Sequence, residues 1–152
     1  MTSKPHKARG FTLIEMSVVI LLMGIVAAFG IPAYLKLNRS LQLKGAVANL
    51  AGQLQLMRAK AMATGTTQIM HLYAGTYESD YHIHNNPSGM PDAKWSLPRN
   101  VTYLWSTGTL SGQMLQMTAD GRSDRSGMVI LQTLGGIRDT VNVQLSGLVL
   151  VQ

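Results

Sequence analysis

Residues 10–31 read GFTLIEMSVVILLMGIVAAFGI, and the expected fold is organised around this stretch. Residues 11–31 form an apolar run of 21 residues with one ionisable side chain, Glu15, which is long enough to cross a bilayer as a helix. Leu, Ile, Val and Phe fill 12 of these positions and favour insertion by about 4 to 7 kcal/mol, whereas one acidic residue opposes it by roughly 2.5 to 3.5 kcal/mol at mid-span. The run is therefore predicted to be a transmembrane helix.

The flanks of this run predict its orientation. Three basic residues, Lys4, Lys7 and Arg9, precede it without any acidic residue, so the positive-inside rule keeps the N terminus in the cytoplasm and sends the rest across the membrane. A secretory signal would end in a small-residue cleavage site, and residues 27–30, AAFG, match that pattern poorly. A carboxylate near the start of a membrane helix, as at Glu15, indicates a function.

Residues 9–16, RGFTLIEM, resemble the type III signal of type IV pilins and type II secretion pseudopilins, which a prepilin peptidase cuts after the glycine and methylates at the new N terminus. The resemblance implies that Gly10 is the last leader residue, that Phe11 becomes the N-methylated first residue, and that Glu15 acts in assembly. A freed amino terminus in the membrane is a poorly solvated positive charge, which a carboxylate about one turn along a neighbouring helix can neutralise. The alternative is that Glu15 is tolerated at the membrane interface of an ordinary anchor.

A second helical pattern follows the apolar run. Gly30 and Pro32 predict either a kink or unwound stretch in one long helix or the end of the membrane helix, because proline breaks the hydrogen-bond ladder. Beyond Pro32, apolar residues recur at steps of four and three, which is typical of the buried face of an amphipathic helix. These residues are Leu43, Val47, Leu50, Leu54, Met57 and Ala61. We expect this helix to end at Gly65.

From residue 66 onward the apolar pattern has period two, with turn residues between the segments. The expected strands are 67–73, 77–84, 101–105, 114–118, 128–132, 140–145 and 148–151. The expected turns lie near Gly75, in the loop 85–91, and at residues 120–121, 135–136 and 146–147. These signals predict an antiparallel meander.

The fold class that follows is α+β, with one long N-terminal helix packed on a C-terminal antiparallel β-sheet domain. The predicted division is a leader at 1–10, a transmembrane and assembly helix at 11–31, an amphipathic helix at 32–65 and a β domain at 66–152. A length of 152 residues allows one compact domain, and 46% hydrophobic residues exclude a disordered chain. The net charge of +6 falls to +3 once the leader is removed, which is ordinary for a soluble domain.

The sequence offers few candidates for chemistry. It has no cysteine, which excludes disulfides and thiolate sites. His82 and His84 would share one face of a strand and could bind a metal with a third ligand such as His71, but we interpret them as surface or partly buried polar residues. Asp120, Ser123 and Asp124 could meet a calcium ion, although a hairpin turn explains DGRSDR better. With no convincing nucleophile, base and orienting acid, we expect no enzyme, no metal and no cofactor.

Residues 50–61 and the C-terminal SGLVLV also resemble the H-type minor pseudopilins and the FimT-like minor pilins. This resemblance implies a minor pseudopilin of a type II secretion system, anchored in the inner membrane by one span, with a periplasmic C-terminal domain, and then placed in a pseudopilus or pilus. Its partners would be the prepilin peptidase and other major and minor pilins or pseudopilins. The alternatives are a FimT-like minor type IV pilin involved in pilus assembly or DNA uptake, and an anchored domain that never polymerises.

DNA is not an expected partner of this chain. The DNA-binding proteins that it resembles carry a Gly-Arg-x-Arg pattern near the C terminus, and here Gly147 is followed by Leu148, Val149 and Leu150. Three other arginines could form a smaller basic patch, namely Arg122, Arg125 and Arg138. Aspartates at positions 120, 124 and 139 lie close to them in sequence, so we expect little binding at physiological salt.

Overall fold

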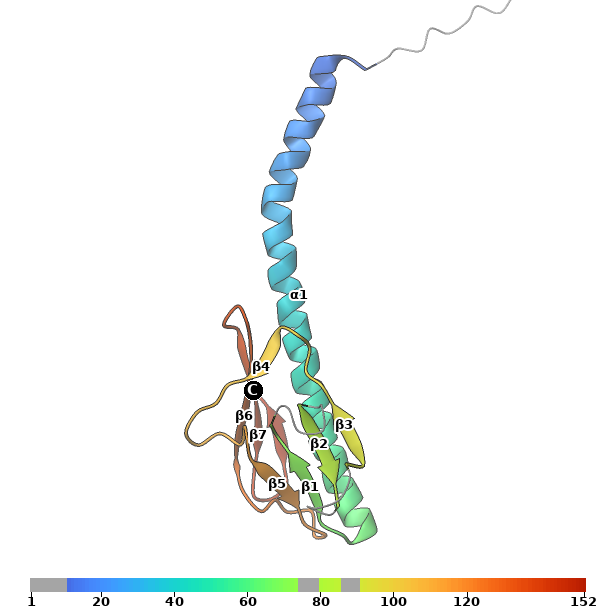
Figure 1. Ribbon diagram of the computed structural model, residues 1–152, viewed down its shortest axis with the longest axis vertical. Coiled ribbons are helices and arrows are strands. Elements are labelled where there is room, and N and C mark those ends of the chain that lie inside the picture. The colour runs from blue at the N-terminus through green and yellow to red at the C-terminus, as the bar shows by residue number, and fades with distance from the viewer. Residues whose placement is uncertain (1–10, 74–79, 86–90) are drawn as a thin grey trace, which may run out of the picture. The chain divides into compact units, whose positions relative to one another are not determined.

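The computed structural model describes residues 11–73, 80–85 and 91–152 of the chain (Figure 1). One helix is followed by eight strands: α1 (Leu13–Thr64), β1 (Gln68–His71), β2 (Tyr81–His84), β3 (Ala93–Trp95), β4 (Val101–Tyr103), β5 (Met114–Met117), β6 (Gly127–Thr133), β7 (Arg138–Val143) and β8 (Val149–Val151). The chain divides into two compact units, and the boundary lies between Leu37 and Asn38. The predicted α+β class is confirmed.

In the first unit, α1 is helical throughout. It remains helical through Gly30 and Pro32, so the predicted unwound stretch or helix end at these residues is wrong. Pro32 removes only its own N–H from the hydrogen-bond ladder, and a glycine in a helix costs only about 1 kcal/mol. The long apolar helix on both sides compensates for these local losses.

In the second unit, α1 buries one face against the β-sheets. All six residues of the predicted apolar stripe are buried, and Ala46 and Ala51 widen it. Lys44 and Gln55 are exposed on the opposite side, as the helical period requires. The helix ends at Thr64, and Gly65 follows with a φ of +65°, a conformation that glycine adopts without strain.

The described strands form two four-stranded sheets in which every pairing is antiparallel. The first sheet has the order β3-β2-β1-β5 and the second the order β4-β6-β7-β8. A single meander, as the sequence predicted, is therefore wrong, because β5 pairs with β1 in the first sheet while β4 pairs with β6 in the second.

The exchange of strands between the sheets is made by residues 104–113. This segment first follows β6, where Leu104 N–H donates to Ile130 O at 2.9 Å and Leu110 N–H donates to Met128 O at 2.8 Å. It then reaches the end of β1, where Leu72 N–H donates to the carbonyl oxygen of Gln113 at 3.0 Å. Backbone pairing with both sheets thus carries the chain from one to the other, and no turn signal in the sequence records it.

Most strands lie where the period-two pattern predicted them, although many of them are shorter than predicted. The exception is β3, which the sequence did not predict. It has three residues, only partly buried, and pairs at the edge of the sheet through Tyr81 opposite Trp95. A strand this short carries too little alternation to be recognised. The turn near Gly75 and most of the predicted loop 85–91 lie outside the described residues.

The hydrophobic core lies between the buried face of α1 and the two sheets. Its largest fully buried apolar side chains come from the helix and from strands of both sheets: Leu43, Leu50, Leu54, Met57, Met70, Leu115, Met117 and Leu131. Each such side chain contributes about 1.5 to 3 kcal/mol by leaving water. The core therefore joins two sheets that share few backbone hydrogen bonds.

Arg58 of α1 marks a point where two hairpin turns meet the helix. Its Nε–H donates to the carbonyl oxygen of Gly121, in the turn after β5, at 2.9 Å. Gly147, in the turn between β7 and β8, has a φ of +76°, and a Cβ added there would lie 2.0 Å from Gly121 O and 2.9 Å from Arg58 Nε. Only glycine fits at Gly147, both for its conformation and for the space around it.

We predict that Gly147→Ala destabilises the β domain by about 2 to 5 kcal/mol, through left-handed strain together with the backbone clash. Gly136→Ala is the matched control, because Gly136 has a φ of +78° and nothing within 4 Å of its added Cβ. It should cost about 1 to 2 kcal/mol, the conformational part alone. Urea unfolding followed by the fluorescence of Trp95 and Trp105 reports on this unit; equal losses would show that packing at Gly147 is unimportant.

Candidate functional site

α1 begins with a capping box built by Thr12 and Glu15. Thr12 N–H donates to Glu15 Oε2 at 2.8 Å, and the Thr12 hydroxyl donates to the same oxygen at 2.9 Å. In return, Glu15 N–H approaches Thr12 Oγ1 at 3.3 Å. This reciprocal pattern satisfies N–H groups that the first turn of a helix leaves without partners. Within a single chain, Glu15 therefore caps its own helix.

The capping role of Glu15 is a functional feature that the sequence reasoning missed. The signal was present, because Thr12-Leu13-Ile14-Glu15 fits the T-x-x-E pattern of a capping box directly before an apolar run. Glu15 was interpreted only as a charge in an apolar segment. The geometry shows that the same carboxylate also has a local partner.

The surroundings of Glu15 are apolar and exposed. Phe11, Ile14, Val18 and Val19 are all largely exposed around it. The helix includes an 18-residue window with a mean hydropathy of 2.4, of which none is buried within the chain. By length and composition this helix can cross a membrane, and an acid at such a place needs a partner there.

Asp120, Ser123 and Asp124 form a local turn. Thr118 N–H donates to Arg122 O at 2.9 Å, and the Asp120 carboxylate accepts from the Thr118 hydroxyl. Asp124 Oδ1 accepts from the backbone N–H of Gln116 at 2.8 Å. The turn interpretation of DGRSDR is confirmed, and the carboxylates bond to groups of their own hairpin.

The C-terminal region presents leucine where the DNA-binding pattern requires arginine. Leu148 is 44% exposed and Leu150 is 37% exposed. The arginines considered for a basic patch are exposed as well: Arg122, Arg125 and Arg138. Arg125 Nε pairs with Asp124 Oδ2 at 3.0 Å, so part of its charge is compensated.

The structure brings His71, His82 and His84 together on neighbouring strands β1 and β2. His82 and His84 were expected at the surface or partly buried, and that expectation is wrong, because they are 0% and 2% exposed; His71 is 7% exposed. Burial lowers the pKa of His71, assisted by His84, and burial together with the other two histidines and Lys94 lowers the pKa of His82 to about 4. At neutral pH these two imidazoles are uncharged.

Comparison with known proteins adds to this geometry. Residues 5–31 match a family described as the prokaryotic N-terminal methylation motif. No curated protein matches the chain. The matched region contains Gly10, Phe11 and Glu15, together with the whole predicted membrane run.

Solved structures with a similar fold are minor pilins and a minor pseudopilin. Two crystal forms of the type IV minor pilin FimU from Pseudomonas aeruginosa have TM-scores of 0.56 and 0.58 at 16% identity, covering 72% of this chain and 92% and 87% of theirs. The minor pseudopilin EpsH of the Type 2 Secretion System of Vibrio cholerae has a TM-score of 0.56 at 13% identity, covering 73% of this chain and 96% of its own.

The N-terminal part of the resemblance is confirmed by the matched motif, and the fold is similar to that of minor pilins and a minor pseudopilin. The chain carries the methylation motif of prepilin-type proteins, and its fold is that of type IV pilin-like minor subunits. The motif implies processing by a prepilin peptidase and assembly with other pilins, and the similar solved structures are structural subunits. Identities of 13% and 16% do not separate a secretion pseudopilin from a minor pilin.

Proposed function

We propose that this prepilin-type chain is a minor pseudopilin, a non-enzymatic structural subunit of a type II secretion pseudopilus that takes part in protein secretion across the outer membrane. The observation that carries the proposal is the position of Glu15, a carboxylate in the first turn of an exposed apolar helix and within the methylation motif. An ordinary membrane anchor gains nothing from a charge at this place.

Assembly is coupled to processing in this proposal. A prepilin peptidase cuts after Gly10 and methylates Phe11, which releases a positively charged amino group at the start of the helix. The chain is held in the inner membrane by one span, with the β domain in the periplasm, until it joins the filament. A charge in an apolar surrounding requires a partner, and Glu15 of an adjacent subunit supplies it.

Glu15 then has two competing partners. In the single chain its carboxylate accepts from the N–H and hydroxyl of Thr12, at 2.8 and 2.9 Å. In a filament the same carboxylate accepts from the amino group of a neighbour's Phe11. In the capping box only the carboxylate carries a charge, whereas in the filament both partners are charged. Opposite charges attract strongly in an apolar surrounding, so the exchange favours the assembled state. The capping box keeps Glu15 satisfied until a neighbour arrives.

The alternative is a FimT-like minor type IV pilin that serves pilus assembly or DNA uptake. The similarity to the minor pilin FimU supports a pilus subunit as much as the similarity to EpsH supports a secretion subunit. The exposed Leu148 and Leu150 speak against DNA uptake, because phosphate groups are bound by basic side chains.

We predict that the processed protein begins at Phe11 with a methylated amino group. The cut follows Gly10 because the motif ends its leader there, just before the apolar helix. Mass spectrometry of the N-terminal peptide, from protein purified out of its native membrane, measures both changes. A protein that keeps residues 1–10, or that begins near Phe29, contradicts the proposed processing.

A second prediction separates the two roles of Glu15. Glu15→Gln keeps an acceptor for the capping box but removes the charge, and Glu15→Ala removes both. Both variants should be cleaved and inserted normally yet fail to join filaments, because an unpaired buried charge costs about 3 to 5 kcal/mol.

Thr12→Val is the matched control for this experiment. It removes the hydroxyl of the capping box but keeps the carboxylate, so it should assemble far better than Glu15→Gln. Crosslinking to partner subunits in cells measures incorporation. If Glu15→Gln assembles normally while Thr12→Val fails, the capping box and not the charge pair is what assembly needs.

A third prediction concerns DNA. The unit Asn38–Gln152 should bind double-stranded DNA weakly or not at all at about 150 mM salt, because its exposed arginines are few and partly compensated. Fluorescence anisotropy with a labelled duplex is the measurement. Saturable low-micromolar binding that Arg122→Ala or Arg138→Ala abolishes would favour the DNA-uptake alternative.

A further inference from the structure

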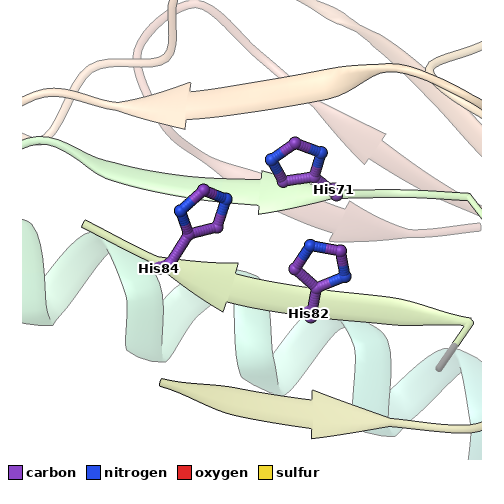
Figure 2. Close-up of side chains that lie close together, drawn as sticks. All are labelled: His71, His82 and His84. Carbon is purple, nitrogen blue, oxygen red and sulfur yellow. The ribbon is translucent and has the colours of Figure 1, made fainter. Parts of the chain in front are cut away.

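Three histidines converge on one face of the first sheet. In the β1–β2 ladder His71 lies directly opposite His82, and His84 lies opposite Ile69, two residues along the same face. Figure 2 shows the rings of His82 and His84 on β2 and the ring of His71 on β1 gathered on one side of the strands, with α1 passing behind. One ligand nitrogen from each histidine lies within 4.8 Å of the other two.

We propose that His71, His82 and His84 form a binding site for a divalent transition metal ion with a preference for nitrogen ligands, above all Zn²⁺. Imidazole suits zinc, copper and nickel, whereas calcium and magnesium require oxygen ligands. Three protein ligands leave a fourth position of a tetrahedral zinc site open to water or another donor. The site is separate from the N-terminal motif and does not depend on the proposed function.

The hydrogen bonding of the His71 ring also supports a metal site. Its Nδ1 is hydrogen-bonded to the hydroxyl of Tyr73, while its Nε2 is buried and has no hydrogen-bond partner among the residues that the structure describes. Ligating histidines commonly donate their second ring N–H to an outer partner, which fixes the tautomer and the ring orientation. When Nδ1–H donates to Tyr73, Nε2 carries the lone pair that a metal requires.

The present spacing of the rings defines the movement that binding requires. The ring centroid of His71 lies 4.6 Å from that of His82 and 4.7 Å from that of His84, and the His71 ring is stacked with both. Tetrahedral zinc, with Zn–N bonds of about 2.0 to 2.1 Å, needs ligand nitrogens about 3.3 Å apart. Binding therefore requires the rings to turn about their side-chain torsions and to bring the ligand nitrogens closer by roughly 1.5 Å.

The distribution of histidines along the chain supports a common role for these three residues. The chain has four histidines, and the three outside residues 1–10 are all members of this cluster. All three are buried, at 7%, 0% and 2% exposure, whereas histidine is intermediate in burial in most proteins. A shared metal would take one nitrogen of each ring as a ligand.

A positive charge opposes the site and supplies a sensitive control. Lys94 of β3 lies opposite His82 in the ladder and is exposed. Its charge disfavours a nearby cation, so Lys94→Gln should tighten metal binding. A purely structural cluster of rings would not respond in this way.

A bound metal would act as a cross-link in this domain. It would join β1 to β2 across the ladder, in a protein that has no cysteine and hence no disulfide. Metal binding to the folded state alone stabilises that state by mass action. The metal would thus hold the centre of the first sheet together.

The test uses the full chain in non-ionic detergent, without a histidine tag and with His6→Ala to remove the remaining histidine. Zn²⁺ titration by calorimetry should show one ion per chain, and Zn²⁺ should raise the thermal midpoint measured by tryptophan fluorescence, reversibly with chelator. Co²⁺ should give the visible absorption of tetrahedral nitrogen coordination. Failure of the His6→Ala protein to bind either ion stoichiometrically overturns the proposal.

Variants decide whether the cluster is the site. His71→Asn, His82→Asn and His84→Asn should each weaken Zn²⁺ binding by about a hundredfold or more, and loss of the outer partner in Tyr73→Phe should weaken it about tenfold. Lys94→Gln should tighten it. If the histidine variants do not fold, Tyr73→Phe and Lys94→Gln remain, since neither removes a ligand. Binding that is unchanged in both of these would place the metal elsewhere and overturn the assignment.

Discussion

One helix has to satisfy two different surroundings, and the rest of the molecule depends on that constraint. Between Leu13 and Leu37 the helix is apolar and its side chains are exposed. Between Asn38 and Thr64 it is amphipathic and buries a single stripe against the sheets. The first part presents apolar side chains that suit it to a membrane. The second part needs the folded β domain to cover its buried stripe. Neither part of α1 is stable by propensity alone, because an isolated helix gains little in water.

The features that the sequence predicted correctly are those controlled by local physics. The stripe from Leu43 to Ala61 follows from the helical period, and Gly65 ends the helix because its backbone can be left-handed. The paired positions of His82 and His84 follow from the two-residue period of a strand. In each case the relevant residues lie within a few positions of one another.

The features that were missed depend on residues far apart in sequence. Nothing near β5 indicates that it pairs with β1. His71 was named as a possible third ligand beside His82 and His84, but only the register of the β1–β2 ladder shows that it lies opposite His82. The sequence left open whether the helix continues through Gly30 and Pro32 or ends there. It continues, because the length of helix on both sides outweighs the local loss of one donor. The capping box could have been predicted from the T-x-x-E pattern of Thr12 and Glu15, but Glu15 was interpreted only through its charge.

The pairing of β1 with β5 bears on the order in which the domain can fold. β6, β7 and β8 are joined by short turns, so they can pair as soon as all three have been made. β1 is made earlier, yet one of its edges remains uncovered until Met117 is available opposite Gln68. An uncovered strand edge can pair with the wrong chain. Among the described strands, β1 thus waits for a partner from the greatest distance along the chain, and until β5 has been made this edge is open to pairing with other chains.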